Sequence, residues 1–431
     1  MTLGAYAGLL RRNRNFRLVW FSQIISEIGD WFYSVAVLSF VIQATGSARL
    51  MSLAFVMQVF PQVISSPFAG VLNDRISRRR IMISTDWARA VIVLAMLLVR
   101  GPGMIWLLYI LLFLETVMWA LFEPARTASI PNMTEGEDTA VANALSSATW
   151  AVAFAIGSGI GGIVQAYFGR DSVFVIDSLS FVASALLLTR TRYHEPHLEG
   201  QHPLSWRDFV NYGEILDGFR YARRDRERFR TMFVKTGLGF LGVNWIALPL
   251  LGEREFPVHL PGVSDSSAGT LGMSFLLSAR GVGAMVGALA GSAWAGIVLW
   301  RLRNNIGIGF CLGAAGYFLL SFAPNFAIAA LCVILSHAGG SMAWTASTTL
   351  LQKITEDKFR GRVFSSEYAM SMSVLAAITY ASGVAIDAGW SVRAVCAVAG
   401  GLILLPAIWW FATAASSDPQ ASSSGTDRSR L

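Results

Sequence analysis

The strongest constraint on this chain is a series of apolar runs, each about twenty residues long, that recurs along most of its length. An α-helix needs roughly 20 apolar residues to cross a hydrocarbon layer about 30 Å thick, because it rises about 1.5 Å per residue. The sequence therefore predicts an all-α integral membrane protein with twelve transmembrane helices. The third and ninth runs are the least apolar of the series. The predicted spans lie at residues 17–43, 48–72, 80–99, 104–128, 142–168, 172–190, 232–251, 268–299, 304–322, 326–350, 363–388 and 391–414.

Charged residues are scarce, and their placement fits a membrane protein better than a nucleic-acid-binding protein. They make up 14% of the chain, against about 25% in a typical soluble protein. The net charge is +7, but the basic residues stand in short clusters between the apolar runs and not on one polar domain. We therefore expect a lipid bilayer as a partner of this chain, and no nucleic acid.

The basic residues also predict the orientation in the membrane, because cytoplasmic loops carry an excess of lysine and arginine. With the N-terminus on the cytoplasmic side, most of the 34 lysines and arginines fall on that side. Both termini are then cytoplasmic, because the number of spans is even. Arg89 and Arg280 lie within predicted spans. The basic residues of the outer loops are Arg49, Arg100, Arg170, Arg254 and Arg393.

The chain divides into two halves with six predicted spans each. The long polar segment 191–231 separates them and is expected to be a cytoplasmic loop between bundles at 1–190 and 232–414. The residues 415–431 are rich in serine, glycine and aspartate and are expected to form a disordered cytoplasmic tail.

Short motifs recur in the two halves at nearly the same offset. Residues 70–75 are echoed by 296–301, and residues 132–135 are echoed by 353–356. Duplicated six-helix halves with a binding site near the middle of the bilayer are a recurring plan of secondary transporters. The sequence therefore predicts one transporter unit, made of two bundles, for a small-molecule substrate.

Acidic residues within the spans are the candidates for proton coupling, because an ionisable group in the membrane interior is unfavourable and points to a function. A low-dielectric cavity favours the neutral form of a carboxyl group, which can then bind and release protons near neutral pH. The alternative is that each acid is paired with a hydroxyl, an amide or an arginine and fixes a helix. In order of preference, the candidates are Asp30, Glu115, Glu27 and Asp177. Asp86 and Arg89 are three residues apart, and we expect them to pair with each other or with the loop after the second span.

Aromatic and amide side chains within the spans are candidates for a pocket that takes a bulky amphipathic molecule. The alternative is that they are core residues. The candidates are Trp31, Phe32, Trp119, Asn244, Trp245 and Trp344.

The sequence lacks the motifs of several other functions. It contains no Walker-type phosphate-binding loop, no cluster with metal-ligand spacing and no arrangement typical of nucleophilic catalysis. We therefore expect no catalytic residues, no cofactor and no metal site, and we do not expect ATP to drive the protein directly.

The loop after the second span reads Gly-Val-Leu-Asn-Asp-Arg-Ile-Ser-Arg-Arg-Arg over residues 70–80. A glycine, an acid–base pair and a basic cluster in this place resemble the signature loop of the major facilitator superfamily. The resemblance implies two six-helix bundles around a central cavity, which is lined in part by the first and fourth spans. It also implies a cytoplasmic gating loop that stabilises the outward-open state. The residues that it assigns to this role are Gly70, Asp74, Arg75, Arg78 and Arg79.

Three further motifs narrow the resemblance: Gly-Asp-Trp at 29–31, Phe-Glu-Pro-Ala-Arg at 122–126 and Ala-Asn-Ala-Leu at 142–145. They are similar to a drug and siderophore exporter branch that includes enterobactin-type exporters and macrolide efflux proteins. The fifth span also resembles the antiporter motif of the superfamily, although Ser158 stands where that motif has proline. The antiporter-like glycines are Gly157, Gly161 and Gly162.

The resemblance implies a proton-coupled exporter of small amphipathic molecules of the drug, macrolide or siderophore type. We expect it to work by alternating access, as a monomer in the cell (inner) membrane. Two alternatives share this fold, namely a translocator of lipids or lysophospholipids and a proton-coupled importer. A third alternative, from another class, is a membrane scaffold or sensor that carries no flux.

Overall fold

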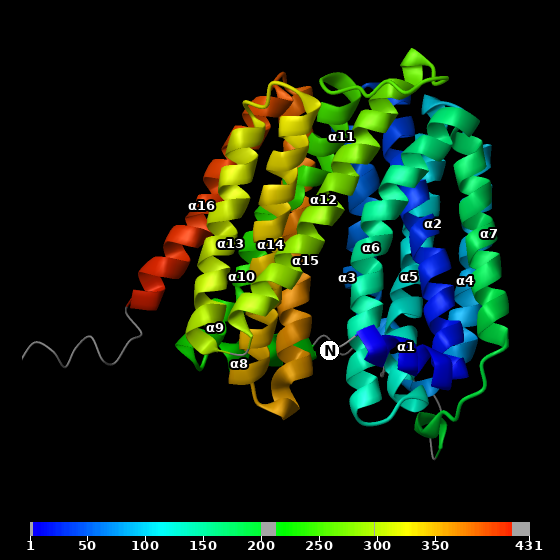
Figure 1. Cartoon of the computed structure of the whole chain (residues 1–431), viewed down its shortest axis with the longest axis vertical. Helices are drawn as coiled ribbons and strands as arrows, with labels where there is room; N and C mark the ends of the chain where they lie inside the picture. The colour runs from blue at the N-terminus through cyan, green and yellow to red at the C-terminus, as the bar shows by residue number, and fades with distance from the viewer. Residues whose placement is uncertain (1–2, 200–212, 297, 416–431) are drawn as a thin grey trace, which may run out of the picture.

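The computed structural model describes residues 3–199, 213–296 and 298–415, which form helices joined by short loops and contain no strand. Figure 1 shows two bundles of roughly parallel helices side by side, the N-terminal half in blue to green and the C-terminal half in green to red. The prediction of an all-α membrane protein made of two six-helix bundles is confirmed. Residues 200–212 of the predicted central loop and residues 416–431 of the predicted tail lie outside the described residues.

The N-terminal bundle follows a short helix, α1 (Leu3–Arg12), and three of its six long helices begin at a side-chain cap. Asn13, Ser47 and Ser77 each accept a hydrogen bond from a backbone N–H in the first turn of the helix that follows. Such caps satisfy N–H groups that have no partner within the helix. The six long helices are α2 (Arg14–Thr45), α3 (Ala48–Arg75), α4 (Arg78–Ala95), α5 (Ile105–Met133), α6 (Glu137–Phe168) and α7 (Arg170–Thr189). The short 3-10 turns η1 (Met96–Leu98) and η2 (Pro102–Met104) join α4 to α5.

The C-terminal bundle begins after η3 (Pro196–Leu198) and the short helix α8 (Gly213–Ala222), which packs against α15. Its first span is made of several short segments, and five long helices complete it. The short segments are α9 (Arg226–Met232), α10 (Val234–Leu238), the 3-10 turn η5 (Gly239–Val243) and α11 (Asn244–Arg254). The long helices are α12 (Asp265–Ala295), α13 (Leu299–Leu320), α14 (Phe326–Ile354), α15 (Asp357–Asp387) and α16 (Val392–Ala415).

The predicted seventh span, residues 232–251, is interrupted where its backbone approaches α15 most closely. A Cβ added at Gly239 would lie 2.9 Å from Val374 Cγ1, and one added at Gly242 would lie 2.5 Å from the carbonyl oxygen of Leu375. Glycine permits this approach because it has no Cβ. The segment nevertheless remains apolar and long enough to cross a membrane, over Arg226–Arg254.

Eleven helical segments of the described residues are long and apolar enough to cross a membrane. The twelfth span of the fold is α13, which packs against α14 and α16 inside the C-terminal bundle. Arg303, Asn304 and Asn305 lie near its start and lower its mean hydropathy. This helix corresponds to the predicted ninth run, which is one of the two least apolar in the sequence.

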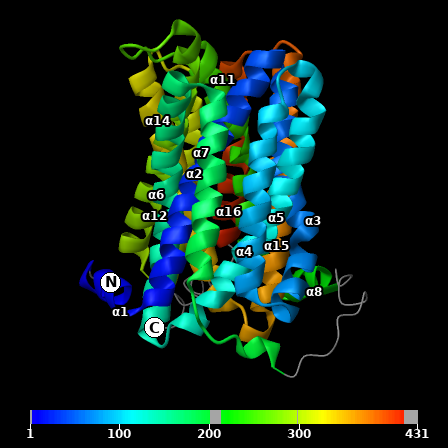
Figure 2. The same cartoon turned by 90° about the vertical axis from the view of Figure 1, so that its right-hand side faces the viewer.

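The two bundles meet mainly through α6 against α12 and α3 against α15. Figure 2 views the N-terminal bundle from its own side, with α2, α7, α4 and α5 in front of the C-terminal helices. A Cβ at Gly281 of α12 would lie 2.7 Å from Ala155 Cα of α6, and one at Gly162 would overlap the hydroxyl of Ser274. Small residues therefore allow the two bundles to pack backbone to backbone.

The antiporter-like glycines of α6 divide between two partners. Gly157 and Gly161 face α2 of the same bundle, where an added Cβ would lie 2.9 Å from Trp31 Cβ and 2.8 Å from Phe32 Cα, respectively. Gly162 faces the other bundle. The position of these glycines explains close packing, and their role in antiport stays a prediction.

Hydrogen bonds fasten the bundles together at the end that carries the turn between α2 and α3. Gln43 Nε2 donates to Glu253 Oε1 at 2.8 Å, and Arg254 Nη2 donates to the carbonyl oxygen of Gly46 at 3.0 Å. Asp387, the last residue of α15, accepts from the backbone N–H of Ala48 at 2.8 Å. In Figure 1 the ribbons of the two bundles approach each other at this end, near α11, and stand further apart near α1 and α8.

Candidate functional site

Aromatic rings from both bundles meet at their interface in a group that we call the interbundle aromatic cluster. Trp31 of α2 and Trp245 of α11 stack with their ring centroids 6.2 Å apart and an angle of 7° between the planes. Phe154 of α6 lies 4.0 Å from Trp31, and Phe55 of α3 lies 4.4 Å from Trp245. Trp150 of α6 meets Trp31 edge-on at 5.9 Å. Two of the predicted cavity residues, Trp31 and Trp245, therefore lie in contact across the interface.

Arg280 of α12 places its guanidinium group over two of these rings. Its Cζ atom lies 4.3 Å from the ring centroid of Trp245 and 4.4 Å from that of Phe154. Its Nε and Nη1 atoms are buried and have no hydrogen-bond partner among the described residues. The sequence places Arg280 within a span, but it did not identify the residue as a candidate, because its ring partners come from other helices.

A second arginine, Arg89 of α4, gathers three carboxylates inside the N-terminal bundle, and we call this group the Arg89 cluster. Its Nη2 atom lies 2.5 Å from Asp30 Oδ1, and its Nε atom lies 2.8 Å from Glu115 Oε1. Its Nη1 atom lies 3.8 Å from Asp86 Oδ1. The expected pairing of Asp86 with Arg89 is present, but Asp30 and Glu115 are closer partners that the sequence spacing did not indicate.

The acids of the Arg89 cluster differ in their exposure. The side chain of Asp30 is 19% exposed, whereas that of Glu115 is 4% exposed and that of Asp86 is fully buried. Glu115 is also paired at its other oxygen, where Tyr33 donates its hydroxyl at 2.9 Å. Asp30 directly precedes Trp31, so it is the acid of this cluster that adjoins the interbundle aromatic cluster.

Asp177 of α7 is sealed behind α2. Its side chain has no exposed surface, and its Oδ1 atom accepts a hydrogen bond from Ser180 at 3.2 Å. A Cβ at Gly29 would overlap both Asp177 and Ser180. The glycine of the Gly-Asp-Trp motif therefore lets α2 approach α7. The next two residues of the motif, Asp30 and Trp31, contact Arg89 and the interbundle aromatic cluster, respectively.

Glu27 belongs to a separate polar group around Arg126 of α5. Arg126 Nη2 donates to Glu123 Oε1 at 2.5 Å, and its Nη1 donates to Gln23 Oε1 at 2.7 Å. Gln23 in turn donates to Glu27 at 2.8 Å, and Arg126 lies 4.0 Å from Glu27. This group contains two of the resemblance motif residues, Glu123 and Arg126.

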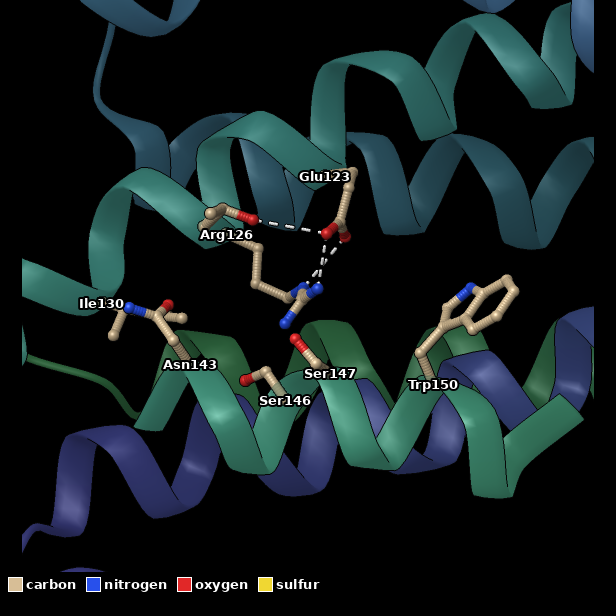
Figure 3. Close-up of a pocket in the computed structure, with 8 residues that line it drawn as sticks. Glu123, Arg126, Ile130, Asn143, Ser146, Ser147 and Trp150 are labelled. Carbon is tan, nitrogen blue, oxygen red and sulfur yellow. Dashed lines mark hydrogen bonds and ion pairs between the residues drawn. The ribbon is translucent and has the colours of Figure 1, made fainter. Parts of the chain in front are cut away.

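A pocket of about 270 Å³ lies beside this group, between α5 and α6. Figure 3 shows the Glu123–Arg126 pair directed from α5 toward the serines of α6, with Trp150 at one end. Since Trp150 also contacts Trp31, the pocket adjoins the interbundle aromatic cluster. The pocket is lined by Glu123, Arg126, Thr127, Ile130, Asn143, Ser146, Ser147 and Trp150.

The predicted gating loop joins α3 to α4, and several of its contacts lie within the N-terminal half. Asp74, with a side chain that is 74% exposed, lies 3.8 Å from Arg78 Nη2. Arg78 Nη1 also donates to the carbonyl oxygen of Ala128 at 2.8 Å, and Arg79 Nη2 donates to that of Thr189 at 2.5 Å. The gating role stays a prediction. The other two residues assigned to it, Gly70 and Arg75, lie in the last two turns of α3.

Two further cavity candidates, Phe32 and Asn244, are buried. Phe32 packs against Gly161 of its own bundle, and Asn244 Nδ2 donates to the carbonyl oxygen of Leu241 at 2.5 Å. Their positions fit the alternative that they are core residues.

Trp344 lies beside a buried ion pair of the C-terminal bundle. Lys235 Nζ lies 2.8 Å from Glu367 Oε2 and 4.5 Å from the ring centroid of Trp344. Trp344 is 37% exposed, and Trp119 of α5 is half-buried. Neither tryptophan lies in the interbundle aromatic cluster.

Residues 4–426 match the family described as transmembrane secretion effector. This chain belongs to that family. Its relatives include macrolide efflux protein A of Streptococcus pyogenes, which is 24% identical over 363 residues, covering 81% of this chain and 84% of that protein. The putative bacilysin exporter BacE of Bacillus subtilis is 22% identical over 355 residues and covers 81% and 83% of the two chains. The matches to the uncharacterized transporters YkuC and YfiS of Bacillus subtilis are shorter, and span 56% and 43% of those proteins.

Solved structures of other transporters share the fold of this secretion effector. A POT family transporter in complex with 5-aminolevulinic acid superposes with a TM-score of 0.73 at 12% identity, covering 94% of this chain and 96% of that one. The nucleoside transporter NupG has the same TM-score at 12% identity, with coverages of 92% and 99%. At this identity the likeness concerns the fold alone. The resemblance to the major facilitator superfamily and its exporter branch is confirmed, and the chain is a multi-pass membrane transporter for small molecules.

Proposed function

We propose that this secretion effector is a proton-coupled exporter of small amphipathic molecules of the drug, macrolide or siderophore type. The names of its relatives, a macrolide efflux protein and a putative bacilysin exporter, support export. A substrate with an apolar body suits the interbundle aromatic cluster, because aromatic rings bind such surfaces.

The Arg89 cluster is the observation that carries the proton-coupling proposal. One guanidinium group carries one positive charge, but three carboxyl groups lie within 4 Å of it. Buried charges without a partner are strongly unfavourable. The cluster is therefore best accommodated with protons on some of its carboxyl groups, and Asp30 is the member with the most access to the bundle interface.

Proton transfer at Asp30 would change the strength of its hydrogen bond with Arg89 and the position of the neighbouring Trp31 ring. An ionised Asp30 holds Arg89 through a charge-assisted hydrogen bond, which a neutral carboxyl group weakens. Because Asp30 and Trp31 are consecutive residues of α2, a shift of Asp30 would move the ring that stacks on Trp245. This connection would link the protonation state to the packing of the two bundles.

Alternating access in this proposal separates the bundles at one end while they close at the other. With the orientation that the basic residues favour, the fastened end faces outward and both termini lie in the cytoplasm. The structure described here is then inward-facing, and the gating loop of residues 70–80 would form its contacts between the bundles in the outward-open state. We propose a monomer in the cell membrane, with bundles at residues 1–190 and 232–414.

The experiment that tests this proposal is transport into proteoliposomes with an acidic lumen. We expect accumulation of amphipathic compounds such as enterobactin above the level of protein-free liposomes, through transporter molecules whose cytoplasmic side faces outward. Asp30→Asn should reduce the gradient-driven part about tenfold or more, because the neutral amide cannot carry a proton. Asp171→Asn is the matched control, since Asp171 is a half-exposed acid that is paired with Arg100.

The result that contradicts the proposal is gradient-driven accumulation by Asp30→Asn at the wild-type rate. Asp30 would then be a structural partner of Arg89. Transport of the same compounds only in the opposite direction would instead identify an importer.

A further inference from the structure

Arg280 is a partly buried cation for which the described part of the chain supplies no counter-charge. Its Nε and Nη1 atoms have no acceptor, and no carboxylate of a described residue lies within ion-pair distance of it. A buried donor without a partner is unfavourable, and a charged donor more so. Something other than these residues is therefore expected to satisfy it.

The rings beside Arg280 stabilise the positive charge but leave its N–H groups unsatisfied. The centroids of Trp245 and Phe154 lie 4.3 Å and 4.4 Å from its Cζ atom. A ring face attracts a cation electrostatically. The N–H groups of Nε and Nη1, however, point outward in the plane of the guanidinium group, and each of them needs an oxygen acceptor in that plane.

Three cations of the bundles have their own carboxylates, whereas the buried Arg230, which lies over the ring of Trp410, has an Nε atom without a partner, as Arg280 does. Arg89 has Asp30 at 2.5 Å, and Lys235 has Glu367 at 2.8 Å. Arg126, beside the pocket of Figure 3, has Glu123 at 2.5 Å. Arg280 differs from these three cations in having no carboxylate, and it differs from Arg230 in lying where both bundles contribute aromatic rings.

We propose that Arg280 recognises an anionic group of the substrate, and that the substrate is an organic carboxylate with an apolar, ring-containing body. A guanidinium group binds a carboxylate through paired N–H···O hydrogen bonds. The apolar body would stack on Trp31 and Trp245, which belong to different bundles and separate when the bundles move apart. This inference rests on the proposed transport function and specifies its substrate class.

The acids near the aromatic cluster do not favour a cationic substrate in this arrangement. Asp30 is the nearest along the chain, next to Trp31, and its carboxylate is already held by Arg89. A cation placed among the rings would meet the charge of Arg280 at short range, whereas an anion would relieve it.

The proposal is tested by equilibrium binding of three probes with one ring system and different head groups. Pyrenebutyrate carries a carboxylate, 1-pyrenebutanol is neutral and pyrenebutylamine is a cation. Binding to the full chain in nanodiscs is read by energy transfer from tryptophan to pyrene, with empty nanodiscs as the blank. We expect the wild type to bind pyrenebutyrate about tenfold more tightly than the alcohol, and the amine most weakly.

Arg280→Gln should abolish the preference for the carboxylate and leave the affinity for the alcohol within about twofold, because the rings remain. Arg170→Gln is the matched control: Arg170 also lies over two rings, Phe40 and Phe174, but it has its own acid, Asp171. It should not change the order of the probes.

Two outcomes would overturn the proposal: equal binding of the three probes by the wild type, or a preference for the carboxylate that persists in Arg280→Gln. If Arg280 only held the bundles together, its replacement would change the affinities for the acid and the alcohol alike. The wild-type measurement needs no variant, so equal binding of the three probes would overturn the proposal even if Arg280→Gln fails to fold. Because the measurement uses no proton gradient, its failure leaves the coupling proposal standing, and failure of gradient-driven transport leaves the probe order intact.

Discussion

Arg89 and Arg280, two arginines within the membrane-spanning helices, are alike in their aromatic neighbours and unlike in their acidic neighbours. Both lie over aromatic rings: Arg89 Cζ is 4.0 Å from the ring centroid of Phe181, and Arg280 Cζ is 4.3 Å from that of Trp245. Arg89 has three carboxylates around it, whereas Arg280 has none among the described residues.

The difference separates a charge that the protein neutralises itself from a charge that it leaves unneutralised. Arg89 is enclosed by helices of one bundle, so its partners remain with it through the motion of the bundles. Arg280 lies where the bundles meet, so its surroundings change whenever they separate. A permanent partner suits a residue that holds helices together, and a missing partner suits a residue that binds a ligand.

The largest expected effect comes from Arg89→Gln, which leaves three carboxyl groups, two of them buried, without their cation. Removing one partner of a buried ion pair typically costs about 3–5 kcal/mol, so we expect a large fall in the melting temperature or loss of the folded protein. Thermal unfolding in detergent would measure this. A triple variant with Asp86→Asn and Glu115→Gln added should recover part of the stability, and recovery would be absent if Arg89 contributed only by packing.

A smaller effect is expected from Gly281→Ala, next to Arg280. The added Cβ would lie 2.7 Å from Ala155 Cα, so α12 must move away from α6. Overpacking of this kind costs about 1–3 kcal/mol, and here it should also move Arg280 from Phe154 and weaken binding of pyrenebutyrate. Gly401→Ala is the matched control, because nothing lies within 4 Å of a Cβ at Gly401. Equal melting temperatures of the two variants would show that this interface is looser than the 2.7 Å distance indicates.

The smallest effect is expected from Glu115→Gln. It removes one negative charge from a cluster that has more carboxylates than cations, and it retains an oxygen that can accept from Arg89 or Tyr33. One of the two hydrogen bonds is lost, so we expect a change of about 1 kcal/mol or less in the free energy of unfolding. A loss as large as that of Arg89→Gln would instead identify Glu115 as the ionised partner on which the arginine depends.

The fold was predictable from the sequence because the membrane imposes a simple length and polarity on each helix. The apolar runs locate all twelve spans, including α13, whose weak hydropathy was visible in advance. The interruption of the seventh span was not predicted. It depends on how closely Gly239 and Gly242 approach α15, and a pattern of hydropathy along one segment does not contain that information.

The candidate site was predictable only in part. Asp30, Trp31 and Trp245 stood out because of their residue types within apolar runs, and they lie at or beside the bundle interface. The Arg89 cluster was not predicted, since Asp30 and Glu115 reach Arg89 from different helices. Arg280 was missed because its ring partners also come from other helices. A single sequence likewise does not reveal that no acid lies near it in the fold.

The contact of Asp387 with the start of α3 affects how easily the two bundles separate in each transport cycle. This carboxylate caps a helix that belongs to the other bundle, accepting from the hydroxyl of Ser47 and the N–H of Ala48. Separation of the bundles removes that cap, but Ser47 accepts from the N–H of Leu50 and remains with α3. The first turn of α3 thus keeps a local hydrogen bond, and the carboxylate of Asp387 is hydrated again after it leaves. This contact between the bundles can therefore break and form again without unfolding the end of either helix.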